Sequence, residues 1–127
     1  MKILLDTHIF IWSATINKLS ETATTAFLDD NNELFFSIAS YWEISIKIGL
    51  GKLALDENWI QNVDDTIHKN SIQWLPIDQS HCQRVTTLPR HHGDPFDRML
   101  IAQALVEEMT LMTADAKLQQ YTVPTLW

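Results

Sequence analysis

The stretch Lys2-Ile3-Leu4-Leu5-Asp6 decides how the rest of the chain folds. Its short, continuous apolar run predicts a strand that is buried on both faces, which is typical of a parallel sheet. Directly after Asp6, apolar residues recur at the spacing of a helix: Ile9, Phe10, Trp12 and Ile16. A buried strand that leads at once into a helix predicts an alternating α/β fold.

The same alternation of strands and helices continues along the chain. Further strands are predicted at 33–37, 73–77 and 111–113, with a further candidate strand at 123–127. Helices are predicted at about 20–30, 40–48, 56–69, 78–88 and 95–109, with a short helical turn at 115–121. Ser20 and Ser40 start the first two of these helices, and Gly49 and Gly51 favour a left-handed end to the second. We therefore expect one domain, residues 1–127, whose parallel sheet is covered by helices on both faces.

Composition and charge limit the function. A chain of 127 residues that is 46% hydrophobic is large and apolar enough to build a core, which argues against disorder. The formal net charge of −7 weakens broad, non-specific binding to nucleic acid, because acidic proteins repel phosphate. Residues 1–65 hold ten acids and four bases, whereas residues 66–127 hold six acids and five bases. A surface that faces an anion is therefore expected in the second half.

The sequence has the pattern of neither a signal peptide nor a membrane span. Asp6 and His8 interrupt the first apolar run, and nowhere do eighteen apolar residues follow one another without a charge. Cys82 is the only cysteine, so no disulfide can form within the chain, which is typical of a reducing compartment. We therefore expect a cytoplasmic protein without a membrane partner.

Acidic residues fall where an α/β sheet forms its functional crevice. Asp6 ends the first predicted strand and Asp115 follows the fourth, so parallel strands bring both to the same edge. Glu43 is expected in the first turn of the 40–48 helix, and Asp94 and Asp97 open the long 95–109 helix. These acids can complete a cluster at that edge.

Each acid also has a structural explanation. Ser40 and Glu43 have the spacing of a capping box, and Asp94-Pro95-Phe96-Asp97 fits an N-cap, a first-turn proline and a first-turn acid. Asp6 and Asp115 also fit helix caps. Four carboxylates in one crevice, however, repel by about 4 kcal/mol per close pair at an effective dielectric constant near 20. Protonation or a divalent cation must relieve that repulsion, and oxygen ligands select Mg²⁺ or Mn²⁺, which suits phosphoryl chemistry.

Four motifs, taken in their order and spacing, resemble a known family. They are Leu4-Leu5-Asp6-Thr7, Trp42-Glu43-Ile44, the stretch Asp94-Pro95-Phe96-Asp97-Arg98-Met99-Leu100-Ile101-Ala102-Gln103-Ala104, and Thr113-Ala114-Asp115. The chain resembles the PIN domain ribonucleases, and within that family the VapC-type toxins of bacterial toxin–antitoxin pairs. The resemblance covers nearly the whole chain, and the third motif is the most specific. It implies a three-layer α/β/α sandwich and metal-dependent endonucleolytic cleavage of RNA that leaves a 5′ phosphate and a 3′ hydroxyl.

The resemblance also implies site residues and partners. Asp6, Glu43, Asp97 and Asp115 would form the catalytic pocket and hold Mg²⁺ or Mn²⁺. Thr7, Asp94 and Thr113 would support it, the two threonines through hydroxyl hydrogen bonds. The implied partners are the RNA substrate, a cognate antitoxin protein and a second copy of the chain. His8 departs from the pattern, because many relatives carry Asn or Ser there.

Contacts to the phosphates of RNA are expected from the less acidic half. The candidates are Arg84, Arg90, His91, His92 and Arg98, with Lys47 and Lys52 near the other wall. The alternative for each of them is a solvated surface charge.

One alternative function lies outside catalysis. A PIN-like module with a catalytically weak pocket would act mainly by binding RNA or an antitoxin-like partner, although the intact set of four acids argues against it. A zinc enzyme is not favoured, because His91 and His92 are adjacent and Cys82 stands alone. Whether one ion or two act, and whether Asp94 is a ligand or only a helix cap, stays open.

Overall fold

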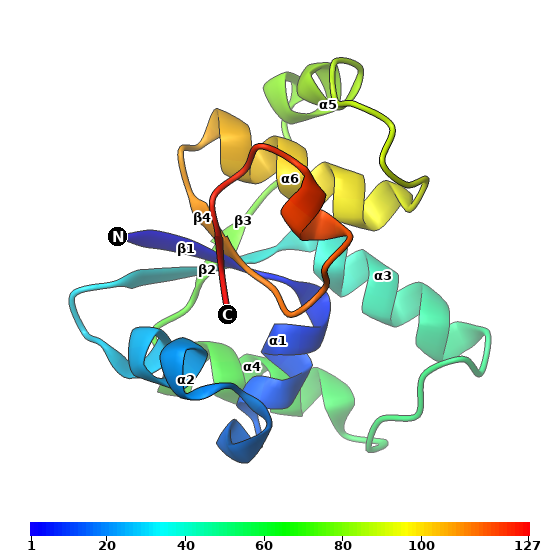
Figure 1. Cartoon of the computed structure of the whole chain (residues 1–127). Coiled ribbons are helices and arrows are strands. Elements are labelled where there is room, and N and C mark those ends of the chain that lie inside the picture. The colour runs from blue at the N-terminus through cyan, green and yellow to red at the C-terminus, as the bar shows by residue number, and fades with distance from the viewer.

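The computed structural model describes the backbone of residues 1–127 and every side chain except that of Ile16. Strands and helices alternate along the chain (Figure 1). In order they are β1 (Lys2–Leu5), α1 (Thr7–Ser13), η1 (Ile16–Lys18), α2 (Glu21–Leu28), β2 (Glu33–Ser37), α3 (Ile38–Gly49), α4 (Trp59–Lys69), β3 (Gln73–Leu75), α5 (Gln79–Val85), α6 (Pro95–Val106), β4 (Thr110–Met112), η2 (Leu118–Gln120) and β5 (Thr125–Leu126). Within the described residues, no helix combines the length and the apolar character needed to cross a bilayer.

All five strands run parallel in one sheet of order β3-β2-β1-β4-β5. The first strand is central, with Leu4 paired to Phe35 of β2 on one side and to Leu111 of β4 on the other. Ile3, Leu4 and Leu5 are fully buried. The prediction of a parallel α/β sheet is confirmed, and the reason is that the apolar run of β1 can only be covered if helices lie on both of its faces.

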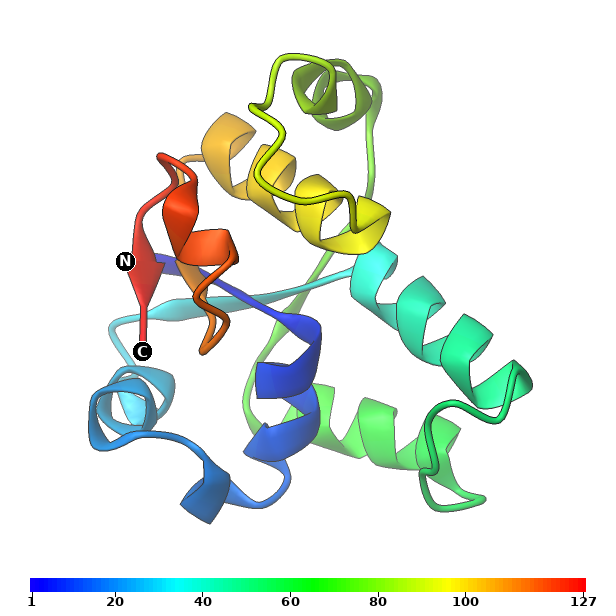
Figure 2. The ribbon, with the colours of Figure 1, turned by 45° about the vertical axis from the view of Figure 1, so that its right-hand side comes forward.

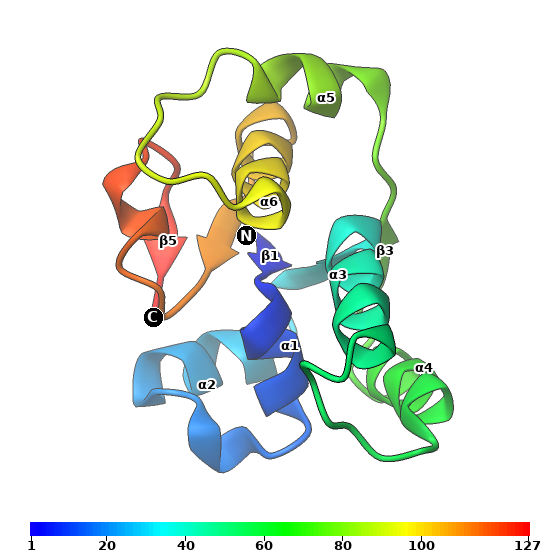
Figure 3. The ribbon, with the colours of Figure 1, turned by 90° about the vertical axis from the view of Figure 1, so that its right-hand side faces the viewer.

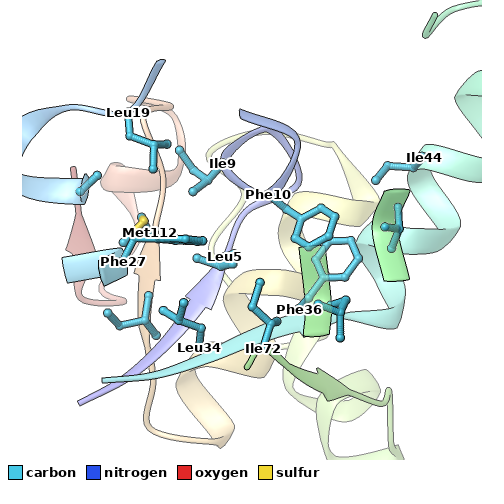
Figure 4. Packing of buried hydrophobic residues seen from close by; sticks show 14 residues of the cluster. Leu5, Ile9, Phe10, Leu19, Phe27, Leu34, Phe36, Ile44, Ile72 and Met112 are labelled. Atoms are coloured by element: carbon cyan, nitrogen blue, oxygen red, sulfur yellow. The ribbon is translucent and has the colours of Figure 1, made fainter. Parts of the chain in front are cut away.

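Alternate residues of β1 contribute to two separate cores. Ile3 and Leu5 face a cluster that includes residues of α1, α2 and α4, in which the rings of Phe10 and Phe36 stack at 3.8 Å (Figure 4). Leu4 faces the other cluster, which is built mainly from α6 and the segments after it. Figure 2 shows the same division, with α5 and α6 on one side of the sheet and α1, α2 and α4 on the other. The structure therefore has the predicted three layers.

The start of α3 differs from the prediction. The helix begins at Ile38, and the Ser37 hydroxyl caps it by accepting the Ala39 N–H at 3.0 Å, so Ser40 is not the N-cap. The capping box of Ser40 and Glu43 is therefore wrong, and Glu43 lies in the second turn rather than the first. The physical reason is that β2 runs into α3 without a loop, so the last strand residue serves as the cap.

Other elements are shorter than predicted. The 73–77 strand ends at Leu75, because Pro76 has no N–H to offer the ladder. The helix predicted from 56 begins only at Trp59. The helix predicted at 95–109 ends at Val106, and two residues later Glu108 adopts the left-handed conformation with φ 56°.

The two glycines at the end of α3 should respond differently to alanine. Gly51 has φ +70°, whereas Gly49 is the last helical residue, and a Cβ at either position would meet no described heavy atom within 4 Å. We expect Gly51→Ala to cost about 1 kcal/mol of unfolding free energy, and Gly49→Ala to add up to about 1 kcal/mol. Urea unfolding of both variants beside the wild type checks this. Equal effects of the two changes would contradict it.

Candidate functional site

Asp6 follows β1 and is held at the carboxyl edge of the sheet. Its Oδ1 accepts the His8 N–H at 2.8 Å, which caps α1, and its Oδ2 accepts the Thr113 hydroxyl at 2.5 Å. Only 6% of the residue is exposed. Burial raises the pKa of the Asp6 carboxyl, although the hydrogen bonds from Thr113 and His8 act in the opposite direction. The Asp6 side chain therefore caps α1 and also holds its carboxylate in a fixed position.

A pocket of about 280 Å³ lies beside Asp6. Its lining combines three carboxylates, one imidazole and three apolar side chains: Asp6, Asp97, Asp115, His8, Ile9, Trp12 and Ala114. Asp115 is exposed, its backbone N–H donates to the Thr113 hydroxyl at 3.1 Å, and its Oδ1 accepts the Lys117 N–H at 2.9 Å. The hydroxyl of Thr113 thus ties Asp6 and the backbone of Asp115 together.

Asp97 enters the site from the first turn of α6. Asp94 caps this helix, because its Oδ1 accepts the N–H groups of Phe96 and Asp97 at 2.9 and 3.0 Å. Burial, followed by the negative charges of Asp94, Asp6 and Glu43, raises the pKa of Asp97 to about 6, while a hydrogen bond with His92 lowers it. Asp97 therefore interacts electrostatically with three other acids.

Glu43 is buried on the wall formed by α3, which packs beside α6 (Figure 3). Its Oε1 accepts the Thr7 hydroxyl at 2.7 Å, and its Oε2 accepts the Lys47 ammonium at 2.7 Å. The hydrogen bond to Glu43 raises the pKa of Lys47, and the charges of Asp94 and Asp97 add to this effect. Lys47 therefore places a positive charge against the acidic residues.

The donor chemistry of this site fits a hard divalent cation. The carboxylates of Asp6, Asp97 and Asp115 surround one pocket and offer only oxygen, which Mg²⁺ and Mn²⁺ prefer over nitrogen or sulfur. In the arrangement shown by the described side chains, no three His, Cys, Asp or Glu residues form a ready-made metal-binding group. Binding of an ion would therefore require these carboxylates to move closer together.

The structure divides the candidate phosphate contacts. Arg90 and His91 are exposed on the 89–93 loop, and Lys52 is exposed after α3. Arg84 bonds the Thr87 hydroxyl next to α5. Arg98, by contrast, is only 8% exposed, and its guanidinium donates to backbone carbonyls and to Tyr121. The Arg98 guanidinium therefore bonds groups inside the fold, and its prediction as a contact to RNA phosphates is corrected.

For two residues near the site, nothing in the sequence indicates the contacts that they make. Ser40 is buried with its hydroxyl 2.9 Å from that of Thr7, and Tyr121 is buried with its hydroxyl 2.8 Å from His92 Nδ1. The partners are 33 and 29 residues apart, so no periodicity connects them. Only the folded chain identifies them.

Comparison with known proteins gives the same fold. The family described as "PIN domain" matches residues 3–124. Ribonuclease VapC22 of Mycobacterium tuberculosis is 27% identical over an alignment of 137 positions, which covers 98% of each chain. The crystal structure of VapBC2 from Rickettsia felis, bound to a promoter DNA fragment, contains a similar chain with a TM-score of 0.73, 19% identity and coverage of 98% and 97%. A chain of VapBC-1 from nontypeable Haemophilus influenzae is similar with a TM-score of 0.67 and 22% identity. The match covers 94% of this chain and 91% of that one.

Proposed function

Because the chain belongs to the PIN domain family and is related to the VapC toxins, we propose that it is a Mg²⁺- or Mn²⁺-dependent endoribonuclease, the toxin of a toxin–antitoxin pair. One observation carries the proposal: Asp6, Asp97 and Asp115 line one pocket at the carboxyl edge of a parallel sheet. This is where open α/β sheets place their ligands. An RNA substrate places the proposed activity in the cytoplasm.

In this proposal the acidic residues divide the work. Asp6, Asp97, Asp115 and Glu43 would hold the ion, and Thr113 and Thr7 keep the carboxylates of Asp6 and Glu43 in place. When bound, a divalent cation lowers the pKa of water and balances charge on a phosphodiester. The raised pKa of Asp97, about 6, belongs to the metal-free site, and a bound cation would favour the ionised carboxylate that a ligand needs.

Positive charge for the substrate would come from two sides of the site. Lys47 lies on the α3 wall beside Glu43, and Arg90 is exposed on the loop before α6, where the exposed imidazole of His91 can add a hydrogen bond. These groups would oppose the repulsion between RNA phosphates and a chain with net charge −7. Local positive charge of this kind favours binding at the site over general binding to nucleic acid.

The partners we propose are an antitoxin protein and a second copy of the chain. The similar chains from Rickettsia felis and Haemophilus influenzae were solved as VapBC proteins. Large apolar side chains are exposed on α3, after it and on α4, with Trp42 at 60%, Leu50 at 64% and Ile60 at 56%. Such exposure is typical of protein interfaces.

A second candidate function is a binding module with little catalysis. The specific observation in its favour is that Lys47 already neutralises Glu43, while the described residues hold no ready-made metal-binding group. RNA or an antitoxin-like partner would then be bound without being cut.

Cleavage of total cellular RNA decides between the two functions. Purified protein is incubated with Mg²⁺ or Mn²⁺, beside a reaction with EDTA and one with folded Asp6→Asn protein. We expect discrete fragments that are absent from both controls, since Asp6 would hold the ion. If the folded wild type binds RNA and yields no fragments with either ion, the binding module replaces the nuclease.

A further inference from the structure

A chain of hydrogen bonds leads from the interior to Asp97. The Arg98 guanidinium Nη1 lies 3.2 Å from the Tyr121 hydroxyl, which lies 2.8 Å from His92 Nδ1. The other ring nitrogen, His92 Nε2, lies 3.3 Å from Asp97 Oδ2. The Arg98 and Tyr121 residues are buried, and only 12% of the His92 side chain is exposed. Water therefore competes little for these contacts.

The first member of the chain fixes the direction of the first bond and favours one direction for the other two. A guanidinium has only donors, so the Tyr121 oxygen must accept from Arg98. The tyrosine proton is then available for His92 Nδ1, which accepts it. A neutral imidazole that accepts at Nδ1 carries its own proton on Nε2, and that proton faces the carboxylate of Asp97. The opposite tautomer would leave the buried tyrosine proton without this partner and turn a lone pair toward an anion.

Arg98 also holds the loop that carries His92. Its guanidinium donates to the carbonyl oxygens of Pro89 at 2.8 Å, Val85 at 3.3 Å and Leu88 at 3.4 Å. The same side chain therefore places the backbone before His92 and orients the ring through Tyr121. Two constraints from one buried residue leave the imidazole little freedom.

We propose that Arg98, Tyr121 and His92 are positioning residues that fix one oxygen of Asp97, so that the other is presented to the pocket. The role at the ion rests on the proposed function, whereas the bonding pattern does not. Outer partners of this kind hold metal-binding carboxylates in place, and their loss weakens metal affinity by about 10- to 100-fold. The charge distribution along the sequence suggested His92 as a phosphate contact, and this proposal gives it a different task.

The first test reads the tautomer of His92 directly. Two-bond ¹H–¹⁵N correlation spectra are recorded on the metal-free, ¹⁵N-histidine-labelled full chain at pH 8, and the His92 signals are assigned by their loss in His92→Gln. We expect Nε2 protonated and Nδ1 unprotonated in the wild type. Tyr121→Phe keeps the ring but removes the hydroxyl, so it should shift His92 toward a mixture of tautomers. A wild-type His92 protonated at Nδ1 would overturn the proposal.

The second test measures Mn²⁺ affinity by the electron paramagnetic resonance signal of free Mn²⁺. We expect His92→Phe, which cannot donate to Asp97, to weaken binding by about 10-fold or more, and Tyr121→Phe to weaken it less. His92→Gln retains an N–H donor and should recover part of the loss. His68→Gln, an exposed histidine on α4, should bind as the wild type does. Thermal melts verify that each variant is folded.

The two tests separate this proposal from the proposed function. Normal Mn²⁺ binding that neither His92→Phe nor Tyr121→Phe weakens would overturn the positioning role and leave the nuclease intact. A wild type that binds no Mn²⁺ would instead overturn the metal centre, and with it the role at the ion. If His92 were then found only as the Nε2–H tautomer, the hydrogen-bond pattern would be supported without any role at an ion.

Discussion

Replacement of Asp97 by Asn is expected to stabilise the metal-free protein while it lowers RNA cleavage by at least about 100-fold. The loss of activity follows because a ligand to the ion should matter at least as much as the outer partners that orient it. The gain in stability follows because burial and the charges of Asp94, Asp6 and Glu43 disfavour the ionised form of Asp97 in the folded chain. An amide removes that unfavourable charge and occupies nearly the same volume.

The gain should depend on pH in a defined direction. The pKa of Asp97 is raised from 3.8 to about 6 on folding, so between these values the folded state binds more protons than the unfolded state. Stability of the wild type therefore falls as the pH rises through this window, and the full penalty is present above pH 6. After allowance for solvent screening, the penalty is about 1–2 kcal/mol. Asp97→Asn should recover it at pH 7.5 and progressively less as the pH falls from 6 to 4.

Urea unfolding in EDTA at several pH values measures this effect. Asp65→Asn is the matched control, because Asp65 is an exposed residue of α4 whose carboxylate bonds only the neighbouring Gln61 among the described contacts. The control should change the unfolding free energy little and show no such trend between pH 4 and 7.5. Added Mg²⁺ should also raise the unfolding free energy of the wild-type protein more than that of the Asp97→Asn variant. A variant less stable than the wild type at pH 7.5 would contradict the electrostatic argument.

Replacement of Arg98 by Met is expected to cost about 3–4 kcal/mol of unfolding free energy. Met retains much of the apolar stem but removes every donor, so the carbonyls of Val85, Leu88 and Pro89 lose their partner. Each buried polar group left without a partner costs about 1–3 kcal/mol, and bonds to a charged group are at the strong end of the range. The loop between α5 and α6 should therefore loosen.

The exposed Arg90 provides the control for this change. Arg90→Met removes the same charge, but from the exposed loop before α6, and we expect it to alter the unfolding free energy by less than about 0.5 kcal/mol. Urea unfolding at pH 7.5 compares the two, and hydrogen exchange of the 86–93 amides locates the loosening. Equal effects of the two substitutions would mean that Arg98 acts through its charge alone and not through its bonds.

Local patterns along the chain were sufficient for most of the architecture. The apolar run of β1 predicted a strand buried on both faces, and helical spacing after Asp6 predicted α1. Ser20 and the Asp94-Pro95 pair were readable as helix starts because capping bonds join residues two or three positions apart. The start of α3 was misplaced because both Ser37 and Ser40 are suitable caps. The predicted strand 33–37 was correct, but α3 follows it without the expected loop, which makes Ser37 the cap.

By itself, the sequence determined the parallel α/β fold and the acids that end up near its carboxyl edge, because periodicity and caps act over a few residues. Only the tertiary structure decided what each polar side chain touches. Thr113 meets Asp6 across 107 residues, and Tyr121 meets His92 across 29. Arg98 resembled a surface charge in sequence, yet the fold buries it against the 85–89 carbonyls. Such contacts depend on how the layers pack, and packing distances between remote residues leave no regular spacing in a sequence.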